Sequence, residues 1–267
     1  MKKIALYRCM FGNYDFVIPD FKMFGNIDYY LFTDNPSISI KNYKTILVKR
    51  QFSNASLDNR YIKIILPRVL YTYSLTIYMD MNIQISGDIL ILINEFINSR
   101  REIGLFSHPY KNSIEDEVAL CLSKKKCNES DLKEEMEYYS SLNLEKKVDF
   151  ITENSIIFRK KHSKKMTEAM SQWFDLVKKF SGRDQISFPT IRELFNINEH
   201  IFSFSPRTKN NGYFIVLPHK VDFKSSTIVN VLKVHTTFIL QLIYKHPPKI
   251  AILFILKILS FTILSRL

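Results

Sequence analysis

The sequence predicts an α/β fold: a mostly parallel, Rossmann-like sheet flanked by helices, followed by a basic helical appendage. Short apolar runs that suit buried strands alternate with longer segments whose apolar residues recur every three or four positions, as on one face of a helix. Polar residues stand directly after several of the apolar runs, at the edge where such sheets bind ligands. The chain has 267 residues, 46% hydrophobic and 13% aromatic, which suits one large domain and excludes a disordered or fibrous protein.

The first half of the chain supplies four of the expected strands, at residues 2–8, 27–34, 43–50 and 74–80. A helical pattern of apolar residues covers residues 56–73, although Pro67 should kink a helix at that point. The segment "SGDILILINEFI" should open the next helix, because a turn signal precedes its apolar residues.

The second half continues the alternation, with strands expected at residues 102–108 and 154–160. Helical patterns cover residues 114–142, with a break near Cys127, and then residues 162–180 and 183–195. A short apolar strand is expected within "YFIVLPHK", residues 213–220. Strands that alternate with helices favour parallel pairing, so ligands should bind beyond the carboxyl ends of the strands.

The net charge of +12 is concentrated at the C-terminal end, where residues 207–267 contain nine lysines and arginines and one acidic residue. We expect a separate tail at 221–267, and its apolar stretch at 250–264 is interrupted by Lys257. That stretch is short for a membrane-spanning helix, which needs about 20 apolar residues. It fits a helix lying on an anionic membrane surface, while a core helix or a subunit contact is the alternative.

The location of the protein is also an expectation from sequence. The apolar part of "MKKIALYRCMFGNYD" is too short for a signal peptide, and the odd number of cysteines, three, is a poor disulfide framework. We therefore expect a cytoplasmic protein held peripherally at the inner face of the cell membrane. Nucleic acid is not an expected partner, because the basic residues alternate with long apolar runs and no nucleic-acid motif occurs.

The motif "YMDMNIQI" places Asp80 and Asn82 where a buried strand ends. Oxygen-bearing side chains two residues apart can converge on Mn²⁺ or Mg²⁺, which also accept diphosphate oxygens. Asp and Asn at such a position also form turns by bonding to their own backbone, and both interpretations stay open from these residues alone.

The motif "FSGRDQISF" contains Ser181 and Asp184 in the spacing of a helix N-cap. A helix N-terminus also presents polar groups to a site. Arg183 would suit a phosphate or carboxylate there, and Asp184 with Gln185 would suit sugar hydroxyls.

Two further pairs of polar residues are candidates for binding an anionic ligand. Arg60 and Lys63 are three residues apart, hence on one helix face, where a solvated surface is the alternative. His219 and Lys220 follow a short apolar strand and could complete a metal–diphosphate site.

Taken in order, several motifs resemble one family over residues 1–220. They are "YRCMFGNYD", "YYLFTDN", "NRYIKIILP", "LTIYMDMNIQI", "FSHPY", "SQWFDLV" and "SGRDQISF". The pattern resembles a bacterial and plant glycosyltransferase-like family that includes plant mucilage and pectin-related proteins and, in bacteria, occurs among surface-polysaccharide genes. It resembles more distantly the retaining galactosyltransferase and glycogenin type of GT-A enzymes.

The resemblance implies a role for each matching position. It makes residues 1–220 a GT-A-like catalytic domain in which Asp80, Asn82 and, more weakly, His219 hold a divalent cation. It places the nucleotide base and ribose at Phe11, Gly12, Tyr14 and Asp34. It gives donor contacts to Arg60, Lys63, Asp80, Arg183 and Lys220, and it puts Asp184 and Gln185 beside the reacting sugar.

The implied activity is transfer of a sugar, hexose in particular, from a nucleotide sugar such as a UDP-sugar to a polysaccharide, lipopolysaccharide or lipid-linked acceptor. The resemblance leans toward retention of configuration. Asp184 would be the catalytic base in an inverting enzyme, whereas the leaving phosphate takes the acceptor proton in a retaining one. A non-catalytic protein that binds a sugar nucleotide, or a nucleic-acid-binding protein, is the alternative.

Overall fold

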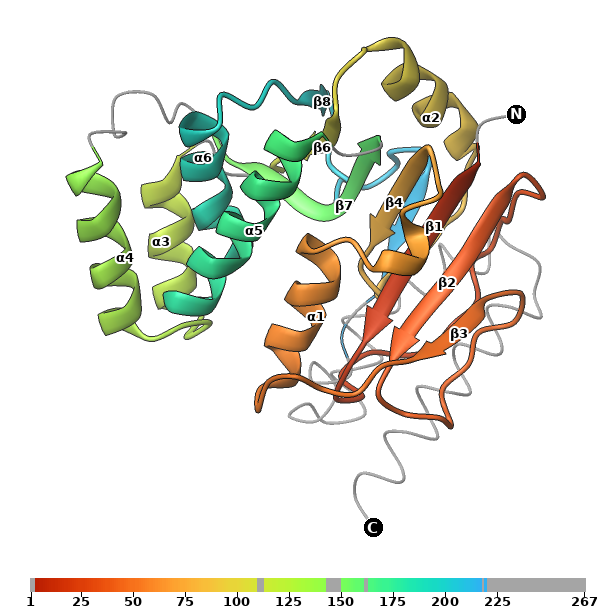
Figure 1. The fold of residues 1–267 in the computed structure, drawn as a ribbon, viewed down its shortest axis with the longest axis horizontal. Coiled ribbons are helices and arrows are strands. Elements are labelled where there is room, and N and C mark those ends of the chain that lie inside the picture. The colour runs from red at the N-terminus through yellow and green to blue at the C-terminus, as the bar shows by residue number, and fades with distance from the viewer. Residues whose placement is uncertain (1–2, 110–112, 143–149, 161–162, 218, 220–267) are drawn as a thin grey trace.

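A seven-stranded sheet forms the centre of the protein in the computed structural model, which describes residues 3–109, 113–142, 150–160, 163–217 and 219 (Figure 1). Strand β7 runs antiparallel to both of its neighbours, β4 and β6, and the other pairs are parallel. In spatial order the strands are β3 (Lys44–Leu47), β2 (Ile27–Thr33), β1 (Ile4–Met10), β4 (Leu75–Met79), β7 (Thr152–Lys160), β6 (Ile103–Ser107) and β8 (His200–Phe202). The expected α/β class, a mostly parallel sheet flanked by helices, is confirmed.

The central strands are apolar on both faces because both faces of the sheet are covered. Strand β1 is buried along its whole length. Its alternate side chains enter two different cores, with Ala5 and Tyr7 in one and Leu6 and Met10 in the other. This double burial explains why β1 reads as a continuous apolar run rather than as an alternating pattern.

Helices supply most of the covering on one face. Buried side chains of one core come from α1 (Ala55–Ile64), α3 (Ile114–Ser123), α4 (Glu129–Ser141), α5 (Lys164–Lys179) and α6 (Asp184–Leu194). Trp173 of α5 is fully buried there and packs against Phe188 of α6. The second core lies under α2 (Ile89–Asn98) and a two-stranded sheet of β5 (Ile83–Ile85) and β9 (Phe214–Val216).

The expected helix at 56–73 is too long and is corrected by the structure. Helix α1 ends at Ile64, and Ile65 has extended backbone angles. Pro67 lacks an amide donor and excludes the helical conformation just before it, and only a short 3₁₀ turn, η1 (Arg68–Leu70), follows. The expected break near Cys127 is confirmed, because α3 ends at Ser123 and α4 begins at Glu129.

One other local expectation needs correction, and two short strands were not expected. Ser181 is not the N-cap of the following helix, because α6 begins at Asp184 with Arg183 at the cap position. Ser181 Oγ instead accepts a hydrogen bond from the Arg183 amide at 3.3 Å, and Gly182 turns the chain with φ +71°. Strands β5 and β8 were not expected from sequence, since three residues are too few to show a period.

The basic tail expected at 221–267 lies outside the described residues. Within the part of the chain that the structure describes, no helix has both the length and the apolar character needed to cross a membrane.

Candidate active site

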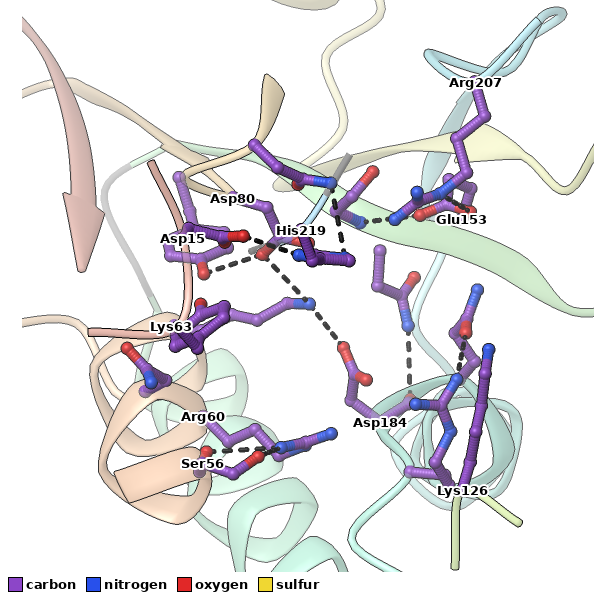
Figure 2. Close-up of a pocket in the computed structure, with 18 of the residues that line it drawn as sticks. Asp15, Ser56, Arg60, Lys63, Asp80, Lys126, Glu153, Asp184, Arg207 and His219 are labelled. Carbon is purple, nitrogen blue, oxygen red and sulfur yellow. Dashed lines mark hydrogen bonds and ion pairs between the residues drawn. The ribbon is translucent and has the colours of Figure 1, made fainter. Parts of the chain in front are cut away.

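A cavity of about 720 Å³ opens at the sheet edge where β1 and β4 end and β7 begins (Figure 2). Its lining combines residues from the strand ends with residues from α1, α3 and the start of α6. Among the described residues, all but one of the site residues expected from sequence line it: Phe11, Gly12, Tyr14, Arg60, Lys63, Asp80, Asn82, Arg183, Asp184, Gln185 and His219.

The turn after β4 is held from inside the protein by Arg8, whose side chain is fully buried. Arg8 Nη1 donates hydrogen bonds to the backbone carbonyls of Asp80 at 2.9 Å and Ile83 at 2.5 Å. Its Nη2 pairs with Asp20 Oδ1 at 2.5 Å, and that oxygen also accepts from the Ile85 amide at 2.9 Å. This buried ion pair fixes the backbone that carries the two polar side chains of "DMN".

The Asp80 carboxylate lies at the cavity wall with two donors beside it. Its Oδ1 accepts from the Tyr78 hydroxyl at 2.8 Å and lies 3.9 Å from Lys63 Nζ. Burial raises the pKa of Tyr78 well above its usual value, and the negative charge of Asp80 adds to the effect. Tyr78 therefore stays protonated and donates a hydrogen bond to Asp80.

Asn82 and His219 come together from distant parts of the sequence. Asn82 Nδ2 donates to the Leu217 carbonyl at 3.1 Å and lies 3.4 Å from His219 Nε2. His219 Nδ1 lies 2.6 Å from Asp15 Oδ1, so the imidazole is oriented by a buried carboxylate. The ring of Tyr14 packs beside it, with centroids 6.2 Å apart.

Asp80, Asn82 and His219 fit a divalent cation. The Asn82 Oδ1 atom is buried and has no hydrogen-bond partner among the described residues, and a buried orphan oxygen of this kind suits a cation. An imidazole oriented by a carboxylate is the usual arrangement of a histidine that binds a metal. No cluster of three or more His, Cys, Asp or Glu suited to a metal occurs in the described ranges, so the fit depends on the Asn82 amide as the third ligand.

Lys63 links two of the carboxylates that line the cavity, Asp80 and Asp184. Its Nζ forms an ion pair with Asp184 Oδ2 at 2.6 Å, in addition to its longer contact with Asp80 (Figure 2). Burial alone would raise the pKa of Asp184, but Lys63, Arg60 and Arg183 outweigh it and lower that pKa to about 2. Asp184 is therefore ionised at neutral pH and is a weak base.

The backbone at the start of α6 is fixed by two neutral donors. Trp173 Nε1 and Asn154 Nδ2 both donate to the Asp184 carbonyl, each at 3.2 Å. Because Trp173 is anchored in the core, it ties the first turn of α6 to α5.

Arg183 and Gln185 flank Asp184 and contact each other. Arg183 Nη2 donates to Gln185 Oε1 at 3.1 Å and to Glu117 Oε1 at 3.0 Å. Glu117 is buried on α3, so the ion pair also joins α3 to α6. The guanidinium thereby orients the Gln185 amide at the cavity wall.

The segment after β1 is held against α1. Asn59 accepts a hydrogen bond from the Phe11 amide at 3.1 Å and donates one to the Phe11 carbonyl at 3.2 Å. Gly12 follows with φ +83°, and a Cβ there would lie 2.7 Å from the Ala55 side chain. Only glycine fits at this close approach of the "FGNYD" motif to the helix.

Arg60 presents positive charge to the cavity from the same face of α1 as Lys63, as the three-residue spacing predicted. Its Nη1 donates to the Ser56 carbonyl at 3.2 Å and to the Ser56 hydroxyl. Its Nε is buried with no hydrogen-bond partner among the described residues. No acidic side chain in the described part of the chain forms an ion pair with Arg60, so its charge is available to an anionic ligand.

One expected donor contact, Asp34, is not found at the cavity, and another lies outside the described part of the chain. Asp34 does not line the cavity, because Asp34 follows β2, which is separated from β4 by β1. The structure therefore gives the predicted ribose contact no support. Lys220 lies outside the described residues.

Several lining residues were missed from the sequence because of the direction of one strand. Glu153, Asn154 and Ser155 begin β7, and the antiparallel course of β7 brings its first residues to the edge where the parallel strands end. Arg207 reaches the same edge and pairs with Glu153 at 3.1 Å. The polar run "TENS" at the start of β7 was the available signal, but in a parallel sheet the start of a strand lies at the edge opposite the ligand.

The protein has a mostly parallel sheet with a charged cavity at the carboxyl ends of its strands. This arrangement is typical of α/β proteins that bind a small ligand at that edge. The model of one family, described as the TOD1/MUCI70 glycosyltransferase-like domain, matches residues 3–211. The chain belongs to this glycosyltransferase-like family, and the resemblance to plant mucilage-type proteins is confirmed.

Solved structures similar to this chain include the crystal structure of mouse xyloside xylosyltransferase 1 in its apo form. The two share 11% sequence identity with a TM-score of 0.44, over 74% of this chain and 84% of that chain. No curated protein matches the chain.

Proposed function

We propose that this protein is a glycosyltransferase with a GT-A-like catalytic domain, which transfers a hexose from a nucleotide diphosphate sugar, in particular a UDP-sugar, to a glycan or lipid-linked acceptor. The observation that carries the proposal is that Asp80, Asn82 and His219 line the same cavity as the buried Lys63–Asp184 ion pair. Membership in a glycosyltransferase-like family supports the reaction class.

The donor diphosphate is assigned to the part of the cavity at Asp80, Asn82 and His219. These side chains would hold Mn²⁺ or Mg²⁺, and a bound cation neutralises charge on the departing diphosphate. Arg60 and Lys63 add two positive charges from α1 toward the same anion. The segment of Phe11, Gly12 and Tyr14 is assigned to the nucleoside.

The sugar is assigned to the start of α6, where Asp184 and Gln185 would bind its hydroxyl groups. The lowered pKa of Asp184, about 2, makes it a poor acceptor of a proton at neutral pH. This favours the retaining reaction over the inverting one, because a retaining enzyme does not need a carboxylate base at this position. Asp184 and Gln185 then orient the sugar and stabilise developing positive charge at its anomeric carbon.

A thermal-shift screen tests the donor site. UDP, GDP, CMP and ADP would each be added with and without Mn²⁺ to the wild-type protein and to Asp80→Ala. A ligand that binds only the folded state raises Tm by mass action. We expect one nucleotide class, UDP in particular, to raise Tm in the presence of Mn²⁺, and we expect Asp80→Ala to abolish the increase.

Asp175→Ala is the matched control, because Asp175 is exposed on α5 and does not line the cavity. This variant should keep the full response. If no nucleotide stabilises the wild-type protein under any metal condition, the proposed function is wrong.

The acceptor is proposed to be a surface polysaccharide, lipopolysaccharide or lipid-linked glycan, and the basic tail is proposed to hold the protein at the inner membrane face. The apolar segment 247–267 with its flanking lysines motivates this part of the proposal. Deleting 247–267 should release the protein from vesicles containing anionic lipid and leave nucleotide binding intact. Equal vesicle binding by the truncated protein in a flotation assay would contradict the anchoring role.

A further inference from the structure

The cavity extends beyond Asp184 to the end of helix α3. Lys124 and Lys126, which follow α3, line this part of the cavity together with Arg183. In Figure 2, Lys126 and Asp80 lie on opposite sides of Asp184. This far end is therefore separate from the region assigned to the cation and diphosphate.

The far end has more positive than negative charge. Arg183 is compensated by its ion pair with Glu117 at 3.0 Å. Neither Lys124 nor Lys126 forms an ion pair with any acidic residue in the described part of the chain. The ammonium groups of Lys124 and Lys126 therefore line the cavity without an acidic partner among the described residues. A neutral sugar would not need these charges for binding.

The positive charges at this end also oppose one another. Burial, the charge of Arg183 and the charge of Lys124 lower the pKa of Lys126, while Glu117 partly offsets them. A bound anion would remove this repulsion. Lysines after a helix also interact favourably with its C-terminal carbonyls, and that interaction accounts for Lys124 at the C-cap of α3. It does not account for the side chain of Lys126 at the cavity wall.

We propose that Lys124, Lys126 and Arg183 form a subsite for an oxyanion carried by the acceptor, either the carboxylate of an acidic sugar or a phosphate ester. This inference rests on the proposed function, because it names the acceptor class of the same cavity. Arg183 borders the subsite with its Nη2 already bonded to Glu117 and Gln185, and the two lysines supply point charges that suit either oxyanion. The acceptor is the source because the donor diphosphate is assigned to the opposite side of Asp184.

Isothermal titration calorimetry of the full chain at low ionic strength tests the subsite. UDP with Mn²⁺ is titrated first and then kept at saturation, so that the diphosphate region is occupied. Glucuronate, glucose 6-phosphate and neutral glucose are then titrated in turn. We expect at least one acidic sugar to bind more tightly than glucose, and whichever binds more tightly identifies the carboxylate or the phosphate as the anion.

Charge-removing variants then locate the binding. Lys126→Gln should weaken binding of the acidic sugar roughly twofold to fivefold, which is the effect of losing one ion pair of an exposed side chain. Lys125→Gln is the matched control, because Lys125 lies between the two lysines and does not line the cavity. It should bind as the wild-type protein does, and both variants should bind UDP equally.

Two outcomes overturn the subsite: no preference for an acidic sugar over glucose, or equal effects of Lys126→Gln and Lys125→Gln. Failure of UDP to bind is a separate result that counts against the proposed function. The acidic-sugar titrations on the three proteins can still be compared in that case.

Discussion

The two ends of the cavity are held in place by different kinds of interaction. At the strand end, which carries Asp80 and Asn82, the buried Arg8–Asp20 pair binds backbone carbonyls and so fixes the course of the chain. At the helix end, which carries Asp184, ion pairs between side chains hold Asp184 to Lys63 and Arg183 to Glu117. Variants at the strand end should therefore change the stability of the fold, and variants at the helix end should change how that stability depends on pH.

The largest expected effect comes from removing the buried guanidinium group of Arg8 at the strand end. Arg8→Met leaves Asp20 buried without its partner and two carbonyls of the turn without a donor. We expect a loss of about 3–5 kcal/mol in the free energy of unfolding, measured by urea denaturation at pH 7.

Arg50→Met is the control for this comparison, because the Arg50 side chain is 35% exposed where it pairs with Asp58. Its cost should be nearer 1 kcal/mol. Similar losses in the two variants would contradict the view that the Arg8 pair fixes the turn.

The helix end should respond to pH instead. The folded-state pKa of Asp184, about 2, lies below its usual value of 3.8. Its contribution to stability is therefore complete above about pH 5 and is lost as the pH falls toward 2, with a total of about 2 kcal/mol.

Asp184→Asn removes this titration, so the unfolding free energies of the variant and the wild-type protein should converge as the pH is lowered from 5 to 2. Urea denaturation at several pH values measures this. The control Asp175→Asn, at an exposed position of α5, should follow the wild-type curve. Parallel curves for wild type and Asp184→Asn would show that the Lys63 pair does not stabilise the folded state.

A smaller effect is expected at Asp15, which orients His219 and is not itself a proposed metal ligand. Asp15→Asn keeps the shape of the residue beside His219 Nδ1 and removes its charge. We expect affinity for Mn²⁺, measured by calorimetry, to fall about tenfold. The control Asp88→Asn, which retains an N-cap side chain on α2, should not change metal affinity.

The smallest expected effect is at Asp34, the strand-end aspartate outside the cavity. Asp34→Ala should bind UDP within about twofold of the wild-type Kd, an energy difference below 0.5 kcal/mol. A much larger loss would return Asp34 to the donor site and would require the cavity to extend toward β2.

The sequence predicted the helices and strands that are long enough to show a repeating pattern of apolar residues. Helix α5 and strand β4 were expected close to their observed positions, because their apolar residues face a core. The sequence predicted a longer helix α1 than the structure has, because the pattern of apolar residues continues past Pro67 while the helical backbone does not. The three-residue strand β8 has no period to detect.

The site was predictable where neighbouring residues carry the chemistry and not where distant residues meet. The sequence contains Asp80 and Asn82 together, but it does not show that Asp15 orients His219 across the fold. The role of Arg8 is not visible in the sequence either, because Asp20 and the carbonyls of Asp80 and Ile83 meet it only in the folded chain.

Lys63 has a consequence for communication across the cavity. One ammonium group contacts Asp184 at 2.6 Å and Asp80 at 3.9 Å, so it cannot respond to a ligand at one carboxylate without changing its interaction with the other. A diphosphate that draws Lys63 away would raise the pKa of Asp184. The carboxyl group of Asp184, followed by NMR titration, would then act as a spectroscopic reporter of occupancy at the opposite end of the cavity.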